Sequence, residues 1–293
     1  MKPRYPIFVP SKGRAEACQT AAFLLEEEVE FRLVVEPSEE EVYRARFPNA
    51  NLLVTPHDNM RLLGVRNWIR DVSEEEGAAR HWQLDDNIWY MARFHRGLRQ
   101  RVHSSIALCT AEDFTDRYTN IGITGFDYWM FAIGKAPPFR LNNHVYSASL
   151  INNAMPYRWR LLYNDDTDLC LQVLSGGLCT VQINAFLIHK IGTMRVKGGN
   201  TDDLYQGDGR LRMARELERY WPGIVTTERR FNRPQHVVRG EWRMFDTQLI
   251  RRDDVDFENL DNEKYRMTLH QLERTPGWKS PTPAKPTQPG DDD

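Results

Sequence analysis

The sequence predicts a single-domain α/β fold in which a mostly parallel sheet is flanked by helices. Over roughly the first 90 residues, short apolar segments typical of buried strands alternate with longer segments typical of helices. The hydrophobic content of 41% and the aromatic content of 11% supply enough apolar material for a sizeable core in a chain of 293 residues. Alternating strands and helices indicate βα units, whose strands run parallel in one sheet.

The first part of the chain is expected to contain four strands, at residues 6–10, 31–36, 51–56 and 80–89. Three helices separate them, at residues 15–30, 38–47 and 64–77. Ser38 stands at the start of an acid-rich segment and is expected to cap the second helix. Gly77 is expected to end the third, because glycine is favoured just after a helix.

The rest of the chain is more mixed. A helix or turn leading into a strand is expected at 111–126, and a hairpin or loops with a strand at 131–153. A helix is expected at 163–178, a strand at 179–190 and a further helix within 203–220. Residues 222–275 show no clear pattern. Residues 277–293 are polar and rich in proline, so we expect a disordered tail and a folded domain over 1–276.

The overall composition excludes few partners, since the formal net charge is only -2. Four cysteines occur without a CxxC pair, which predicts buried free thiols and a reducing compartment. No apolar stretch approaches the roughly 20 residues of a membrane span, and the N-terminus does not resemble a signal peptide. These features predict a cytoplasmic protein without membrane contact.

The first group of candidate functional residues is Asp85, Asp86 and Asn87, directly after an expected buried strand. In an open α/β sheet, ligands bind outside the carboxyl ends of the strands. Carboxylate and amide oxygens suit Mg²⁺ or Mn²⁺, which often bridge to substrate phosphates. The alternative is a solvated turn or a helix cap, in which such residues are common.

A second acidic group opens the helix expected at 163–178, with Asp165, Asp166 and Asp168 within four residues. Acids at a helix N-terminus are stabilised by the helix dipole, so capping explains part of the pattern. Neighbouring carboxylates raise one another's pKa, which makes one of them a candidate general base. The sequence leaves both interpretations open.

Two weaker signals complete the set. Residues 10–14 read PSKGR and follow the first strand, where a loop with glycine and basic side chains can hold phosphate groups. His189 lies near the end of the strand expected at 179–190. A lone histidine is more often structural, but imidazole is also a good metal ligand.

Taken in chain order, these features resemble the GT-A glycosyltransferases over about residues 5–195. The resemblance is carried by the loop at 10–14, the pair Arg66–Asn67, the DxD-like triplet LDDN at 84–87, the acidic helix start at 165–169 and His189. It implies a GT-A-like, Rossmann-like domain with a nucleotide-binding half at 1–90 and an acceptor-binding, catalytic half at 91–276. Two departures are Asn87 at the last position of the triplet, and Asp165 in place of the usual glutamate before Asp166.

Four segments resemble a narrower family, the phage-type TET-associated glycosyltransferases. They are IFVPSKGRAEACQTAAFLL, QLDDNIW, NNHVYSASLINN and YNDDTDLCLQVL. This resemblance implies a hexosyltransferase that moves sugar from a UDP-sugar to 5-hydroxymethylcytosine in double-stranded DNA. It also implies a divalent metal cofactor, Mn²⁺ or Mg²⁺, and a location in the cytoplasm of a phage-infected bacterium.

The resemblances imply roles for individual residues. Catalysis is assigned to Asp166, as general base of an inverting transfer, with Asp165 beside it. Metal binding is assigned to Asp85, Asn87 and His189. Nucleotide-sugar binding is assigned to Pro10, Ser11, Lys12, Gly13, Arg14, Arg66, Asn67, Asp85 and Asp86. Contact with the DNA acceptor is assigned to Arg93, Arg96, Arg140, Asn142, Asn143 and His144.

A DNA acceptor agrees with the arginine run between residues 88 and 111, which contains four arginines and no acid. The run could equally form an ordinary solvated surface. Three alternatives therefore stay open: the same fold acting on a glycan, lipid or protein, a nucleotidyltransferase, or a non-catalytic module that binds nucleotide or DNA. The sequence does not specify the sugar or the oligomeric state.

Overall fold

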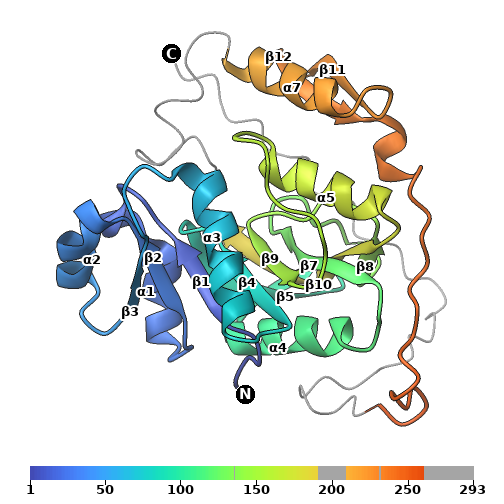
Figure 1. Ribbon diagram of the computed structural model, residues 1–293. Coiled ribbons are helices and arrows are strands. Elements are labelled where there is room, and N and C mark those ends of the chain that lie inside the picture. Colours follow the sequence, from blue (N-terminus) through green and yellow to red (C-terminus); the bar gives the residue numbers. More distant parts are fainter. Residues whose placement is uncertain (135, 191–208, 231, 261–293) are drawn as a thin grey trace.

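The computed structural model describes residues 1–134, 136–190, 209–230 and 232–260. Their centre is a ten-stranded sheet with the order β3-β2-β1-β4-β9-β7-β10-β5-β6, in which β8 also pairs with β10 (Figure 1). The strands are β1 (Ile7–Pro10), β2 (Arg32–Val35), β3 (Asn51–Val54), β4 (Arg80–Leu84), β5 (Ile88–His95), β6 (Leu98–Val102), β7 (Ile121–Tyr128), β8 (Phe139–Leu141), β9 (Ala148–Asn152) and β10 (Cys179–Lys190).

The sheet is mixed, but most of its strands share one direction. β3, β2, β1 and β4 are parallel to one another, and β10 is parallel to β7. β9 lies antiparallel between β4 and β7, while β5 and β8 are antiparallel to β10, and β6 is antiparallel to β5. Seven of the ten strands described in this sheet therefore point the same way, and the predicted α/β fold is confirmed.

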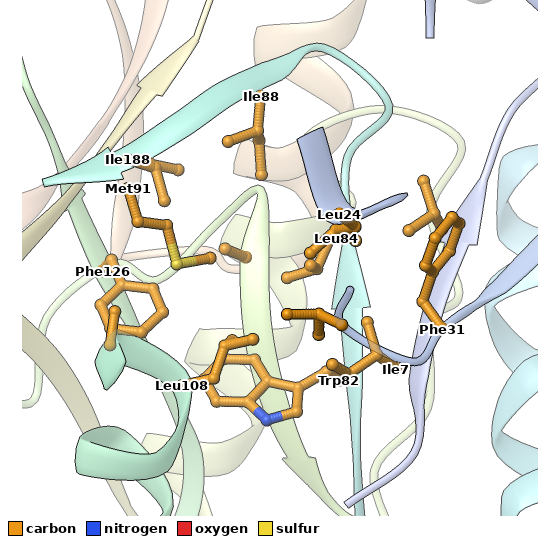
Figure 2. Packing of buried hydrophobic residues seen from close by; sticks show 14 of the residues in the cluster. Ile7, Leu24, Phe31, Trp82, Leu84, Ile88, Met91, Leu108, Phe126 and Ile188 are labelled. Atoms are coloured by element: carbon orange, nitrogen blue, oxygen red, sulfur yellow. The ribbon is translucent and has the colours of Figure 1, made fainter. Parts of the chain in front are cut away.

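Helices cover both faces of the sheet. They are α1 (Gln19–Glu26), α2 (Glu40–Arg46), α3 (Arg61–Glu75), α4 (Ser104–Thr115) and α5 (Asp165–Ser175), while α7 (Gly209–Tyr220) packs on the small second sheet. Leu24 of α1 and Leu108 of α4 pack into the main core beside Trp82, which stacks on Phe126 with ring centroids 5.6 Å apart (Figure 2). Burial of these large apolar side chains is the main stabilising contribution of this face.

On the opposite face, α3 and α5 cover the sheet. Ile69 of α3 packs against Phe8, whose neighbour Ile7 belongs to the main core. Because successive residues of a strand point to opposite faces, β1 contributes to both cores. Val173 of α5 packs against Ile123 of β7. The two helices thereby bring their polar ends to the edge of the sheet where β4 and β10 end.

Part of the segment that the sequence left unassigned forms a second small sheet. β11 (Val225–Arg230) and β12 (Arg233–Val238) make an antiparallel hairpin that packs with α7, and Leu171 of α5 joins their apolar cluster. After the 3₁₀ turn η3 (Arg239–Trp242), the chain returns along the main sheet (Figure 1). There Asn120 and Asn142 donate side-chain hydrogen bonds to its backbone carbonyls.

Two local predictions require correction, and the arginine run can now be placed. Ser38 does not cap α2, because it lies in the 3₁₀ turn η2 (Pro37–Glu39) and its hydroxyl donates to Asp58 Oδ1 at 2.6 Å. The helix expected at 15–30 is divided into η1 (Ala15–Ala17) and α1. The arginine run forms the hairpin of β5 and β6, whose two-residue turn contains Arg96 and Gly97, both with positive φ.

The predictions for Gly77 and for the cysteines agree with the structure. Gly77, with φ of 77°, follows the end of α3 as expected. All four cysteines are buried free thiols. Within the described ranges, no helix has the length and apolar character needed to cross a membrane. The tail at 277–293 lies outside the described residues, and the proposed division into halves at residue 90 stays a prediction.

Candidate active site

The candidate site forms where β4 ends. Asp85 and Asp86 begin the short link from β4 to β5, and this link is held by backbone contacts. The Asp85 N–H donates to the Ser147 carbonyl at 2.7 Å, and the hydroxyl of Thr20 donates to the Asp85 carbonyl at 2.5 Å. These bonds fix the backbone, so the two carboxylates project from a rigid strand end.

Asp86 organises the loop after β1. Its carboxylate accepts a hydrogen bond from Ser11 Oγ at 2.8 Å and pairs with Arg14 Nη1 at 2.9 Å. Ser11 Oγ also lies 2.7 Å from the hydroxyl of Tyr43. Burial raises the pKa of Asp86, although Arg14 and Ser11 oppose this effect. Three of the residues predicted to bind nucleotide are thus in mutual contact.

The rest of this loop is held by glutamates. Lys12 Nζ lies 2.6 Å from the Glu36 carboxylate, and the backbone N–H of Gly13 donates to Glu39 at 2.8 Å. Gly13 has φ of 66°, a conformation that glycine adopts at little cost. A nucleotide phosphate that approached these donors would compete with two protein carboxylates.

Asp85 holds two cations. Lys190 Nζ lies 2.9 Å from its Oδ2, and Arg66 Nη2 lies 3.5 Å from its Oδ1. Burial alone would raise the pKa of Asp85, but the charges of Lys190 and Arg66 outweigh it and lower the pKa below its ordinary value. Asp85 is therefore ionised and fully engaged with protein cations.

Arg66 connects the two acidic groups predicted from the sequence. Its guanidinium pairs with Asp85, with Asp165 at 3.0 Å and with Asp166 at 3.3 Å, while it lies over the ring of Trp159. Its neighbour Asn67 does not reach the site. The Asn67 side chain instead exchanges two hydrogen bonds with the backbone of Trp159, at 2.8 and 3.2 Å.

Asp165 and Asp166 open α5 and share that one arginine. Burial is the main cause that raises the pKa of both, with repulsion from neighbouring carboxylates adding to it and Arg66 opposing it. The pKa of Asp166 is raised to about 7. A carboxylate with such a pKa is suited to accept a proton near neutral pH.

Asp168, one turn further on, has a different environment. It is fully buried and accepts hydrogen bonds from Arg160 at 2.9 Å, from Gln172 at 2.9 Å and from the Trp221 indole at 2.7 Å. These contacts join α5 to the segment that follows α7. Asp168 is thus a structural carboxylate, while Asp165 and Asp166 belong to the site.

His189 faces away from Asp85. Its ring stacks on Tyr90 with centroids 4.7 Å apart and is also flanked by Trp89 and Trp129. The pairing of β10 with β5 shifts register between His189 and Lys190, and it is Lys190 that contacts Asp85. In the part of the chain described, no three or more His, Cys, Asp or Glu side chains are grouped to hold a metal. Because Asp85 is paired with Lys190 and Arg66 while His189 lies among aromatic rings, these two side chains are not arranged here as joint metal ligands, and the metal assignment stays a prediction.

The arginines predicted to contact DNA differ in availability. Arg93 donates to two backbone carbonyls, at 2.5 and 2.7 Å, and packs over Phe186. Arg96 is exposed at the tip of the β5–β6 hairpin. Arg140, on β8, is half-buried, and its charge opposes the burial that raises the pKa of Asp127. Of the three, Arg96 is the one most accessible to a large acceptor.

The remaining three residues assigned to the acceptor make contacts within the fold. Asn142 is buried and donates to two carbonyls of the returning chain, at 2.9 and 3.1 Å. Asn143 donates to the side chain of Gln182 at 2.8 Å. His144 Nε2 lies 3.1 Å from the hydroxyl of Thr167, next to Asp166 in α5. Of these, His144 is linked to the α5 side of the candidate site.

Sequence reasoning missed Lys190, Ser147 and Tyr128. Lys190 Nζ lies 2.8 Å from Ser147 Oγ, which is in turn hydrogen-bonded to the Tyr128 hydroxyl. Lys190 and Tyr128 end two parallel neighbouring strands, β10 and β7. The rule that ligands bind at the carboxyl ends of strands could have indicated both residues.

Comparison with known proteins adds to this geometry. A family model described as TET-Associated Glycosyltransferase matches residues 5–199. No curated protein matches the chain. One similar solved structure is described as a nucleotide-diphospho-sugar transferase from Desulfovibrio desulfuricans G20. It shares 9% sequence identity over 75% of this chain and 99% of its own, with a TM-score of 0.38.

Proposed function

The chain belongs to the TET-associated glycosyltransferase family, and from this premise we propose that it moves a sugar from a UDP-sugar to 5-hydroxymethylcytosine in DNA. The family makes it a glycosyltransferase. The acceptor is proposed from the family's description, because a TET-type oxygenase would supply the hydroxymethyl group on which sugar transfer acts. The proposal is for inversion at the anomeric carbon.

The observation that carries the proposal is the state of Asp166. Its carboxylate lies at the N-terminus of α5, has a pKa raised to about 7 and shares Arg66 with Asp85 at the end of β4. The residues that bind the donor at the strand end would then be neighbours of the general base at the helix end. A non-catalytic binding module has no need of a carboxylate kept close to half protonation.

In the proposed step, the acceptor hydroxyl oxygen forms a bond to the anomeric carbon of the sugar. The bond from that carbon to the diphosphate oxygen breaks, and its electron pair stays on the departing UDP. Asp166 accepts the hydroxyl proton as the new bond forms. Arg66 offsets part of the charge of the neighbouring acids and holds Asp166 in place through their ion pair at 3.3 Å.

For the donor, we propose that the nucleotide lies along the loop at 10–14 and the end of β4. Ser11, Arg14 and Asp86 already form one hydrogen-bonded unit there, with distances of 2.8 and 2.9 Å. Preformed contacts of this kind lower the conformational cost of binding. The same unit would contact the ribose or the base, while the diphosphate would lie towards Asp85.

For the acceptor, the exposed Arg96 on the β5–β6 hairpin is the residue that we propose to contact a DNA phosphate. The target base would have to leave the duplex, since a hydroxymethyl group within the stack cannot reach a buried carboxylate. The exposed ring of Trp89, 44% accessible, could stack on a base. Arg93 is occupied by backbone contacts and is expected to contribute little.

The test is transfer of radiolabelled sugar from a panel of UDP-sugars to two matched duplexes, one with 5-hydroxymethylcytosine and one with cytosine. Label on the modified duplex alone, lost in Asp166→Asn, would support both the activity and the acceptor. UDP release without label on either duplex would keep the glycosyltransferase and direct the search to a glycan, lipid or protein acceptor. No UDP release from any donor, with or without Mn²⁺, would refute the proposed reaction.

A further inference from the structure

Lys190 is a buried amine at the centre of the candidate site, and sequence motifs gave it no role. It is the last residue of β10, and only 7% of its side chain is exposed. Its Nζ lies 2.9 Å from Asp85 Oδ2 and 2.8 Å from Ser147 Oγ, and it stands 5.2 Å from the centre of the Tyr128 ring. A carboxylate, a hydroxyl and the face of an aromatic ring therefore surround the amine.

Stability alone does not explain a lysine in this position. Removing a lysine and an aspartate from water costs several kcal/mol per ion, and apolar residues of similar size are often at least as stabilising. The pair is also accompanied by Arg66, which approaches the other oxygen of Asp85. One carboxylate at the strand end therefore holds two cations side by side, in the position where the sequence predicted a metal ligand.

We propose that Lys190, oriented by Asp85, binds the diphosphate of the donor together with Arg66, and that this pair of cations supplies the charge expected from a divalent metal. This inference rests on the proposed sugar transfer. As the bond between the anomeric carbon and the diphosphate oxygen breaks, its electron pair remains on that oxygen. Lys190 would then donate a hydrogen bond to the oxygen, with no change in the number of protons on either group.

The rival explanation is a divalent metal ion bound at Asp85. A divalent ion could bind Asp85 only if it displaced the ammonium of Lys190, which lies 2.9 Å from Oδ2. The two explanations predict opposite responses to a chelator. They also differ in what Mn²⁺ does to a variant without the amine, because removing Lys190 would free Asp85 for a metal.

The experiment is calorimetric titration of the full-length protein with UDP, once in chelator and once in Mn²⁺. If the inference holds, wild-type Kd values in the two conditions agree within about threefold, since the protein supplies the cations. In chelator, Lys190→Met should weaken binding at least about tenfold, the loss of one charge-assisted contact. Lys190→Arg, which keeps the charge, should bind more tightly than Lys190→Met.

Lys2→Met is the matched control, because Lys2 is an exposed lysine paired with Glu30 far from the site. Its Kd should equal that of wild type, and thermal melting should show that each variant is folded. If Lys190→Met does not fold, the wild-type titrations in chelator and Mn²⁺ still decide between the explanations. UDP release from a UDP-sugar, measured in chelator, provides the second readout.

Wild type that binds UDP only with Mn²⁺ would overturn this inference and leave the proposed sugar transfer intact. Wild-type affinity in Lys190→Met would overturn it as well. Binding of UDP in chelator without transfer to any acceptor would support the role of Lys190 and refute the proposed reaction. No binding under either condition would overturn both.

Discussion

The end of β4 and the first turn of α5 both place carboxylates in one site, yet their charges are compensated differently. Asp85 and Asp86 are matched by three cations, Lys190, Arg66 and Arg14. Among the described residues, Asp165 and Asp166 form ion pairs with Arg66, which they share with Asp85, while the charge of Lys190 acts on Asp166 without a direct pair. The strand end is therefore an ion-paired region, and the helix start is a region with surplus negative charge.

This difference separates binding from proton transfer. A carboxylate with its own cation stays ionised and holds that cation in a fixed place, as Asp85 does with a lowered pKa. A buried carboxylate with too little positive charge keeps its proton to higher pH, as Asp166 does. In the proposed mechanism, the same residue type thus positions cations at the end of β4 and accepts a proton at the start of α5.

The largest expected effect is the loss of kcat in Asp166→Asn, which tests the acidic start of α5. Asp166→Asn should lower kcat for sugar transfer by about 10²–10⁴-fold, because positioned general bases contribute that much and an amide cannot accept the proton. UDP binding should change little, since the strand end is intact. Steady-state transfer assays combined with titration of UDP separate the two effects. A kcat within threefold of wild type would remove Asp166 from the chemistry.

The next effect is the dependence of kcat/KM on pH. The general base must be ionised, and the pKa of Asp166 is raised to about 7, so kcat/KM should rise about tenfold per pH unit below 7 and level off above it. Asp165 repels the ionised form of Asp166 and so contributes to the raised pKa. Asp165→Asn should therefore move the rise to lower pH. Rates measured between pH 5 and pH 9 in both proteins provide the check; identical profiles would contradict the coupling.

A smaller effect separates structure from chemistry within α5. Asp168→Asn removes the charge that accepts hydrogen bonds from Arg160, Gln172 and the Trp221 indole. The free energy of unfolding should fall by about 1–3 kcal/mol, the value of hydrogen bonds to a charged buried group. Urea unfolding measures this loss, and kcat at low temperature should stay within about threefold of wild type.

Asp166→Asn is the internal control for that prediction. Asp166 has fewer partners and surplus negative charge around it, so its replacement should leave the free energy of unfolding at pH 8 unchanged or higher. If Asp166→Asn lowered that free energy and Asp168→Asn did not, the assignment of a structural and a chemical carboxylate would have to be exchanged.

Local sequence patterns predicted much of the fold and part of the site. The βα units before residue 85 follow from the alternation of apolar and helical segments, and the structure confirms their order. Asp85, Asp86, Asp165 and Asp166 were found because acids at a strand end and a helix start are local signals. Ser38 was misassigned because a distant carboxylate, Asp58, competes for its hydroxyl.

The cations of the site could not be predicted in the same way. Lys190 is 105 residues from Asp85, and the two meet only because β9, β7 and β10 follow β4 in the sheet. Strand periodicity implies that His189 and Lys190 face opposite sides, but it does not say which one faces the aspartates. The same holds for Arg93. The sequence shows its charge, but its contact with the Ala185 carbonyl depends on the pairing of β5 with β10.

The smallest effect tests the β4 side directly. Asp86→Asn keeps an oxygen that can accept from Ser11 but removes the charge that pairs with Arg14 at 2.9 Å. If this region binds the donor and takes no part in proton transfer, KM for the UDP-sugar should rise about three- to tenfold and kcat should change less than about twofold. Donor saturation curves at fixed acceptor measure both constants. A fall in kcat comparable to that of Asp166→Asn would show that the ion-paired strand end also takes part in the chemical step, and the division between the two regions would not hold.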